Sequence, residues 1–233
     1  MPRPAVLSRE KIAVAALAVI DRDGLEALSM RSLGRELGVS AMSLYNHVAD
    51  RVGLETLVAE AVVSGIDLTP QTETAAVTEP GEEVRRLMFA LREALNTHPA
   101  AIPLILTRPT SSEAALAPIE ALLEALAGAG FTGLDLLRAY RTLFAFLVGF
   151  AQADLAAAVS AGRPATLDNV AAGVLRLPER SFPRLRACAV AAEGSSSDSE
   201  FSYGLAAVLR GLAVARSSAK YTANPTIRPA TQL

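Results

Sequence analysis

The sequence has few of the residues on which several classes of protein depend. Cys188 is the single cysteine among 233 residues, so the chain cannot form an internal disulfide, and no C-x-x-C motif or Cys/His cluster offers a structural metal site. It has only two histidines, no paired carboxylates in an acid–base spacing and no glycine-rich phosphate loop. An all-α enzyme or carrier therefore has little support, and we expect no enzymatic activity, metal or cofactor.

Long apolar runs are also missing. The longest early run, 12–20, has nine residues and ends in three charged residues without a small-residue cleavage site. It is too short to cross a bilayer and is poor as a signal peptide. Together with the lone cysteine, which suits a reducing compartment, this predicts a soluble cytoplasmic protein with no membrane partner.

The sequence also lacks an excess of charge of one sign. It has 22 Lys and Arg side chains against 24 Asp and Glu, and its pI is near 5.8. The whole chain therefore has no field that would hold it to a polyanion. Any contact with nucleic acid must come from a local patch.

Apolar residues at helical spacing are abundant. Hydrophobic residues make up 51% of the chain, which is enough for a sizeable core in one or two domains, and no strand-like alternation persists. The sequence predicts an all-α protein with an N-terminal domain at 1–63 and a connection at 64–81. A larger helical domain follows at 82–216, and we expect the tail at 217–233 to be disordered.

Four short helices are expected in the first third of the chain. Each begins after a residue whose side chain can accept a hydrogen bond from an orphan N–H of the first turn. These expected caps are Ser8, Ser29, Ser40 and Asp50. Gly38 is placed to stop the second helix in the left-handed conformation that glycine adopts easily.

The larger domain is predicted to contain several further helices, separated by proline and polar residues. The expected helices are 82–97, about 100–106 broken by Pro103, 111–128, 133–160, one or two within 168–191 interrupted by Pro178 and Pro183, and 201–216 after a polar loop at 194–199.

A helix-turn-helix pattern lies at 33–44. Gly34 is small enough to let two helices cross closely, and Gly38 can make the tight turn between them. The pattern is completed by Leu33, Leu37, Val39 and Leu44. A helix presented in this way can enter a major groove about 12 Å wide. Taken alone, the pattern is equally consistent with a helical hairpin inside an all-α domain.

A longer stretch, 8–62, resembles the DNA-binding domain of the tetracycline-repressor (TetR) family across all four helices. The segments GLEALSMR at 24–31, LGVS at 37–40 and LYNHV at 44–48 have the order and spacing of that family. The remainder, to 216, resembles the tetracycline-repressor type of ligand-binding domain. There the similar segments are TRP at 107–109, GF at 130–131, FSYGL at 201–205 and GL at 211–212.

The resemblance implies a homodimeric repressor that binds a palindromic operator and is released by a small-molecule effector. Its third helix would read the major groove, with Met42 against a thymine methyl. Tyr45 of that helix and Arg51 at the start of the fourth would contact phosphates. The residues that would lie at the DNA are Arg31, Ala41, Met42, Ser43, Tyr45, Asn46, His47 and Arg51. Family members often carry a polar side chain where Ala41 stands, so we expect a different operator sequence.

The charge of the reading domain is the main objection to this interpretation. Residues 1–67 hold seven basic and nine acidic side chains. The acids Asp21, Asp23 and Glu26 are expected in the first helix and its turn, away from the presumed contact face. This leaves Arg3, Arg31 and Arg51 on the DNA side. We therefore expect modest non-specific affinity, with specificity that depends on geometry more than on bulk charge.

Dimerisation is expected to use the two most apolar helices, 133–160 and 201–216, in a four-helix interface. The first of these leaves almost no polar face, which a helix exposed on one side of a monomer would not show. The alternative is that both helices are buried within one protomer.

The expected effector pocket is largely apolar and would suit a bulky, mostly hydrophobic molecule. Its predicted lining is Leu87, Leu91, Leu104, Thr107, Arg108, Tyr140, Arg141 and Phe144. Tetracycline repressors hold a magnesium–drug chelate with histidines, whereas Leu104 stands at one such position here, so we expect no metal. The sequence does not separate a repressor from an activator, or from a regulator that needs its ligand to bind DNA.

Overall fold

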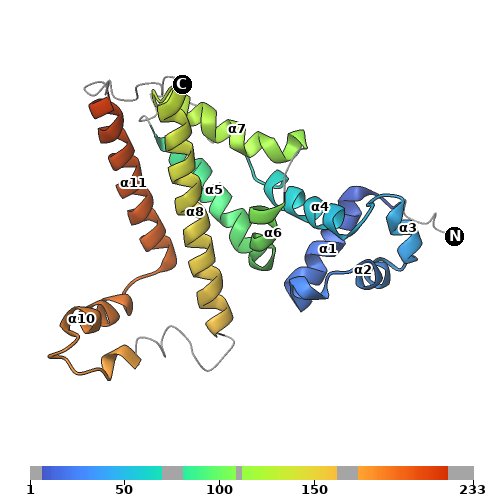
Figure 1. Cartoon of the computed structure of the whole chain (residues 1–233), viewed down its shortest axis with the longest axis horizontal. Helices are drawn as coiled ribbons and strands as arrows, with labels where there is room; N and C mark the ends of the chain where they lie inside the picture. The colour runs from blue at the N-terminus through green and yellow to red at the C-terminus, as the bar shows by residue number, and fades with distance from the viewer. Residues whose placement is uncertain (1–6, 70–80, 109–111, 162–172, 220–233) are drawn as a thin grey trace, which may run out of the picture.

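The computed structural model describes residues 7–69, 81–108, 112–161 and 173–219. Every regular element in these ranges is a helix, so the predicted all-α fold class is confirmed. Figure 1 shows a short-helix unit at one end of the molecule and two long helices, α8 and α11, side by side at the other. None of the described helices is long and apolar enough to span a membrane.

The first unit contains the four predicted helices and one additional 3₁₀ turn. These elements are α1 (Arg9–Asp23), η1 (Leu25–Ala27), α2 (Met30–Leu37), α3 (Ala41–Tyr45) and α4 (Arg51–Ser64). All four predicted caps are confirmed, because each side chain accepts a backbone N–H of the first turn. Ser32 adds a feature that the sequence analysis missed: its hydroxyl accepts from the Ser29 N–H at 2.9 Å, which completes a capping box.

The larger unit is built from longer helices. They are α5 (Glu82–Thr97), η2 (Pro99–Ala101), α6 (Ile102–Thr107), α7 (Glu113–Gly128), α8 (Gly133–Ala161), α10 (Pro183–Ala192) and α11 (Ser197–Ala219). The predicted bounds of α5 are confirmed, and α7 and α8 agree with prediction to within two residues.

Three predictions for this unit are wrong. Pro103 and Pro183 do not interrupt helices; each lies in the first turn of one, where the missing proline N–H would have no partner in any case. The predicted loop at 194–199 is partly helical, since α11 begins at Ser197. Ser196 and Ser199 each accept the other's backbone N–H, a reciprocal cap that starts this helix.

Other predicted segments fall partly outside the described residues. The start of the predicted 168–191 region lies outside them, as does 220–233 of the predicted tail. The first residues of that tail, 217–219, continue α11, so the prediction of disorder is wrong for them.

Two apolar clusters form the interior. The first lies among α1, α2, α3 and α4, and it also includes Ala101 of η2 and Leu104 of α6. The second joins α5, α7, α8 and α11 around fully buried side chains such as Leu143 and Phe201. Helix α4 packs against α1 on one side and against α6 and α7 on the other. It is therefore the element that connects the two clusters.

A buried arginine holds the long helices together. Arg92 of α5 donates to Asp198 of α11 at 2.7 Å and to Asp154 of α8 at 3.2 Å. Its guanidinium also lies over the rings of Phe150 and Phe201, 5.4 and 4.8 Å from their centroids. These contacts fix α5, α8 and α11 relative to one another.

Candidate functional site

The turn between α2 and α3 depends on two glycines. A Cβ placed on Gly34 would lie 2.8 Å from the carbonyl oxygen of Val39, so the two helices approach as closely as the sequence predicted. Gly38 has φ 67°, the left-handed conformation that ends α2. The Val39 N–H then donates to the Gly34 carbonyl at 2.9 Å. These contacts fix the direction in which α3 leaves the turn.

Helix α3 is anchored by one residue and leaves the others available. Leu44 is fully buried, whereas the side chains of Met42 and Tyr45 are 74% and 49% exposed. Large apolar side chains on so short a helix contribute little to the core when they point to solvent, so they are available for a partner. Arg9 donates to the His47 carbonyl at 3.0 Å and ties the end of α3 to α1.

All eight residues predicted at the DNA keep some exposed surface. Arg31, Asn46 and Arg51 are exposed like Met42 and Tyr45, while Ala41, Ser43 and His47 are half-buried. They lie in the unit at the far end of Figure 1 from α8 and α11. Four are on α3, Arg31 and Arg51 are at the starts of α2 and α4, and Asn46 and His47 directly follow the end of α3. Their contact with DNA remains a prediction.

Arg51 belongs to an ion-pair network that sequence reasoning missed. Its Nε donates to Oε1 of Glu55 at 2.8 Å, and Oε2 of Glu55 pairs with Nη2 of Arg108, at the end of α6. Burial would raise the pKa of Glu55, but hydrogen bonds from the two arginines outweigh it and hold that pKa below its usual value. The i,i+4 spacing of Arg51 and Glu55 was the available signal.

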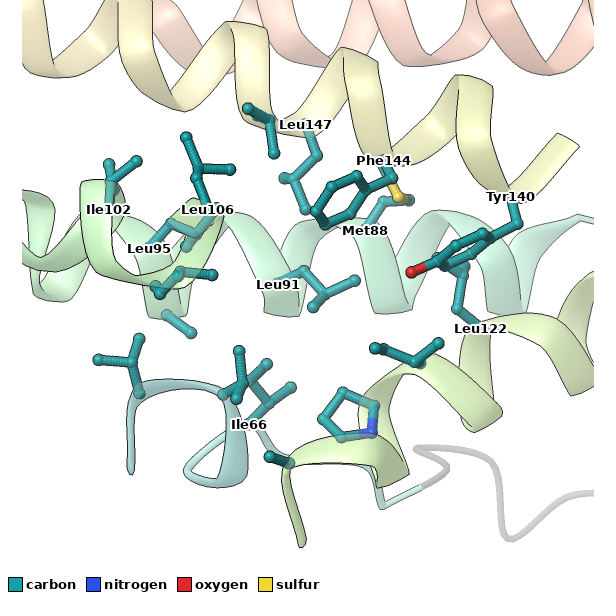
Figure 2. A pocket seen from close by; sticks show the side chains of 18 residues that line it. Ile66, Met88, Leu91, Leu95, Ile102, Leu106, Leu122, Tyr140, Phe144 and Leu147 are labelled. Carbon is teal, nitrogen blue, oxygen red and sulfur yellow. The ribbon is translucent and has the colours of Figure 1, made fainter. Parts of the chain in front are cut away.

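A cavity of about 930 Å³, including its open mouth, lies between α4, α5, α6, α7 and α8 (Figure 2). Every lining side chain is apolar except Tyr140. The lining residues are Val62, Val63, Ile66, Met88, Leu91, Ala94, Leu95, Ile102, Ile105, Leu106, Ala115, Pro118, Ile119, Leu122, Tyr140, Phe144, Leu147 and Val148. No histidine or carboxylate is among them, so these residues do not fit a metal-chelated ligand.

Tyr140 provides the polar group of this cavity. Figure 2 shows its hydroxyl pointing into the space between the helices, with Phe144 beside it. The two rings stack with centroids 6.1 Å apart and 22° between their planes. Burial raises the pKa of Tyr140, so the hydroxyl stays protonated at neutral pH and is available as a hydrogen-bond donor.

Three of the eight predicted pocket residues, Leu91, Tyr140 and Phe144, line the cavity. The other five lie elsewhere. Leu87 is buried in the second cluster and Leu104 in the first, and neither lines the cavity. The hydroxyl of Thr107 donates to the Pro103 carbonyl at 2.7 Å, Arg108 pairs with Glu55, and Arg141 is exposed on α8.

The sequence analysis did not predict most of the residues that line this cavity. It missed the residues that α4, the turn after it and α7 contribute, such as Val62, Ile66 and Leu122. Val62 and Leu122 belong to ordinary helical stripes, and a stripe that lines a cavity has the same composition as one that fills a core.

A helix-turn-helix unit, joined by one helix to a helical unit with an apolar cavity, is the architecture of a class of transcriptional regulators. The family model described as "Tetracyclin repressor-like, C-terminal domain" matches residues 78–216. The chain therefore belongs to the tetracycline-repressor family.

Individual relatives agree with this assignment. The chain is 34% identical over 149 residues to an HTH-type transcriptional regulator of Saccharopolyspora erythraea, a match that covers 64% of this chain and only 61% of that relative. It is 27% identical over 208 residues to the class A tetracycline repressor protein from transposon 1721 of Escherichia coli, covering 87% and 88% of the two chains.

Solved structures show the same fold. Apo ActR of Streptomyces coelicolor superposes with a TM-score of 0.76 at 26% identity and covers 92% of this chain and 99% of its own. ActR in complex with actinorhodin superposes with a TM-score of 0.75 at 27% identity, covering 91% of this chain and 97% of its own.

Proposed function

We propose that this protein is a transcriptional repressor that binds a palindromic operator as a homodimer and is released by a small, mostly apolar effector. One observation carries the proposal: α4 begins at Arg51, beside α3, and its last turns place Val62 and Val63 in the cavity wall. A molecule in the cavity therefore touches the helix that supports the reading unit, which is the helix-turn-helix of α2 and α3. In this proposal 1–63 is the DNA-binding domain, and 82–216 binds the effector and forms the dimer.

The proposed reading surface combines apolar and polar contacts. Met42 rests against a thymine methyl, while Ser43, Asn46 and His47 face base edges or sugar. Tyr45 and Arg51 bind phosphates, which fix the register of the helix but carry no sequence information. In addition, Arg31 lies near the duplex and Ala41 offers only a methyl group. Specificity then depends on how α3 is aimed.

The dimer is part of this mechanism, because a palindromic operator presents half-sites about 34 Å apart. Leu134 and Leu137 of α8 are 58% and 44% exposed in one protomer, as are Tyr203 and Val214 of α11 at 75% and 66%. These side chains on two adjacent helices support pairing with a second copy in a four-helix interface. Sedimentation should find a dimer at micromolar concentration; a monomer would contradict this part of the proposal.

The effector is inferred from the cavity lining. Almost all of its surface is apolar, and Tyr140 supplies one hydrogen-bonding group, which favours an uncharged molecule with few polar atoms. ActR, which superposes on this chain, has been crystallised with actinorhodin. That likeness supports an organic effector here without identifying it.

Release requires that the effector prefer one arrangement of the reading helices. Moving a population from 1:99 to 99:1 needs about 5.5 kcal/mol of differential affinity. The cavity touches α4 directly and also α6, through Ile105 and Leu106. We propose that occupancy shifts α4 and widens the separation of the two reading helices. Structures with and without effector that keep the same separation would contradict this step.

The proposal is tested by selecting binding sites from random duplex DNA and then screening apolar molecules for release of the selected site. We expect an inverted repeat with half-sites about one helical turn apart. Arg51→Ala should reduce the salt slope of binding by about one, the effect of one lost phosphate contact. Arg85→Ala, on α5 far from α3, is the matched control and should leave the slope unchanged. Failure to enrich any inverted repeat would overturn the proposal.

A further inference from the structure

Glu55 is a buried carboxylate on the helix that connects the reading unit to the cavity. Its side chain is only 6% exposed, and each of its oxygens pairs with a different arginine. Oε1 accepts from Arg51 Nε at 2.8 Å, and Oε2 pairs with Arg108 Nη2. A buried carboxylate that loses a partner leaves an acceptor unsatisfied, which is strongly unfavourable. Each Glu55 oxygen therefore needs an arginine nitrogen as its partner. Either two arginines supply one nitrogen each, or one arginine supplies both nitrogens.

Arg51 is placed to contact phosphate rather than to stabilise α4. It is the first residue of the helix, where a positive charge opposes the helix dipole, and its side chain is 52% exposed. Glu55 binds it only through Nε, and its two terminal nitrogens have no hydrogen bond or ion pair among the described residues, while the charge of Glu26 also acts on the guanidinium. The carboxylate thus holds the guanidinium through Nε alone, and the terminal nitrogens remain available for a further contact.

Arg108 connects the same carboxylate to the cavity. It follows α6, whose Ile105 and Leu106 line the cavity wall. The Nε of Arg108 is buried and has no hydrogen-bond partner in the described part of the chain. The guanidinium therefore keeps one unsatisfied buried donor in spite of its pairing with Glu55. The Ser112 N–H, at the start of α7, donates to Glu60 of α4 at 3.1 Å. Helix α4 therefore has a second polar contact, in addition to the pair of Glu55 with Arg108.

We propose that Glu55 is a positioning residue that switches Arg51 between DNA phosphate and itself, under the control of Arg108. With Arg108 in place, each Glu55 oxygen has one arginine and Arg51 offers both terminal nitrogens to phosphate. When effector displaces α6, Arg108 leaves and Oε2 loses its partner. Arg51 then turns edge-on and binds both oxygens through Nε and one terminal nitrogen, a favoured bidentate geometry. The phosphate contact is lost.

This inference rests on the proposed function and can be tested without the effector or the operator. The probe is a random-sequence duplex of about 30 base pairs, long enough for two half-sites. Arg108→Met keeps an unbranched side chain and removes the charge. We expect weaker binding and a log–log salt slope smaller by about 0.9, as for one lost phosphate, although Arg108 itself does not touch DNA. Arg85→Met, which breaks an exposed i,i+3 pair on α5, is the matched control.

Two further variants separate the switch from a loss of structure. Arg108→Lys keeps a positive charge for Oε2 and should restore the wild-type slope. In a Glu55→Gln background, Arg108→Met should change the slope no further, because the neutral amide does not capture Arg51. Unfolding followed by circular dichroism identifies any variant that does not fold, and Arg108→Gln, a smaller change, then replaces Arg108→Met.

The outcomes distinguish the two proposals. If wild-type protein binds the duplex with a normal salt dependence and Arg108→Met has the same slope, the switch is wrong and the proposed function stands. If Arg108→Met has the same effect with and without Glu55→Gln, Arg108 acts through another residue and the switch is again wrong. If wild-type protein shows no salt-dependent binding to duplex DNA, the proposed function fails and the switch fails with it.

Discussion

Replacing Gly34 by alanine should push α3 away from α2. The added Cβ would lie 2.8 Å from the Val39 carbonyl oxygen, about 0.6 Å closer than the 3.4 Å at which ordinary contact begins. The obstacle is backbone, and it is held in place because the Val39 N–H donates to the Gly34 carbonyl at 2.9 Å. The chain therefore cannot relieve the overlap by changing a rotamer.

The magnitude follows from two opposing effects. Overpacking of this kind costs about 1–3 kcal/mol, whereas alanine gains about 0.5–1 kcal/mol over glycine inside a helix. We expect Gly34→Ala to lower the free energy of unfolding by about 1–2 kcal/mol. Gly53→Ala is the matched control: its Cβ would lie 3.4 Å from Val48 and 3.5 Å from Asp50, so it should stabilise α4 by up to about 1 kcal/mol.

Both variants are compared with the wild type by urea unfolding followed by circular dichroism. Protein concentration is held fixed, because the stability of the proposed dimer would depend on it. Since the helical gain is common to both changes, the difference between the variants isolates the steric effect. Gly34→Ala should also weaken operator binding more than Gly53→Ala does. Equal stability of the two variants would refute the close approach of α2 and α3 as the reason for glycine at this position.

Three other predictions follow from the described contacts. Tyr140→Phe should weaken an effector that hydrogen bonds to the hydroxyl by about fivefold, as one lost hydrogen bond does, without weakening DNA binding; titration calorimetry measures this, and unchanged affinity would exclude the contact. Phe201→Ala should lower the free energy of unfolding in urea by about 3–5 kcal/mol, because this fully buried ring packs on three other phenylalanines. Since the folded-state pKa of Glu55 lies below its unfolded value, its ion pairs stabilise the fold above that value and are lost as pH falls through the folded pKa. Glu55→Gln should therefore make stability less dependent on pH in acid, and an unchanged pH profile would contradict the pairing.

The parts of the fold that depend on neighbouring residues were predictable from sequence. Ser8, Ser29 and Asp50 cap helices through atoms three residues away, so their roles can be inferred without knowing the tertiary structure. Gly34 and Gly38 act over a similarly short distance within the turn. Inference from neighbouring residues failed for proline, which ends a helix at some positions and begins one at others. Pro103 would break the interior of a helix but is tolerated in its first turn, and position alone decides which applies.

The cavity and the ion-pair network could not be predicted in the same way. Arg108 meets Glu55 across more than fifty positions of sequence, and only tertiary packing brings α6 against α4. Leu104 and Leu91 are alike in sequence, yet Leu104 fills the first cluster while Leu91 lines the cavity. The direction in which each helix turns its apolar face separates them, and helical spacing does not fix that direction.

Because α4 carries Arg51 at its first residue and cavity-lining valines in its last turns, the proposed function makes effector choice and operator affinity depend on each other. Its 14 residues span only about 21 Å at 1.5 Å per residue. In that proposal, substitutions at Val62 or Val63 that admit a new effector would also alter how α4 holds the helix-turn-helix unit. Substitutions on α8, such as at Phe144 or Leu147, reach the same cavity from a helix that packs mainly on α5, α7 and α11, so directed evolution toward a new sensor should begin there.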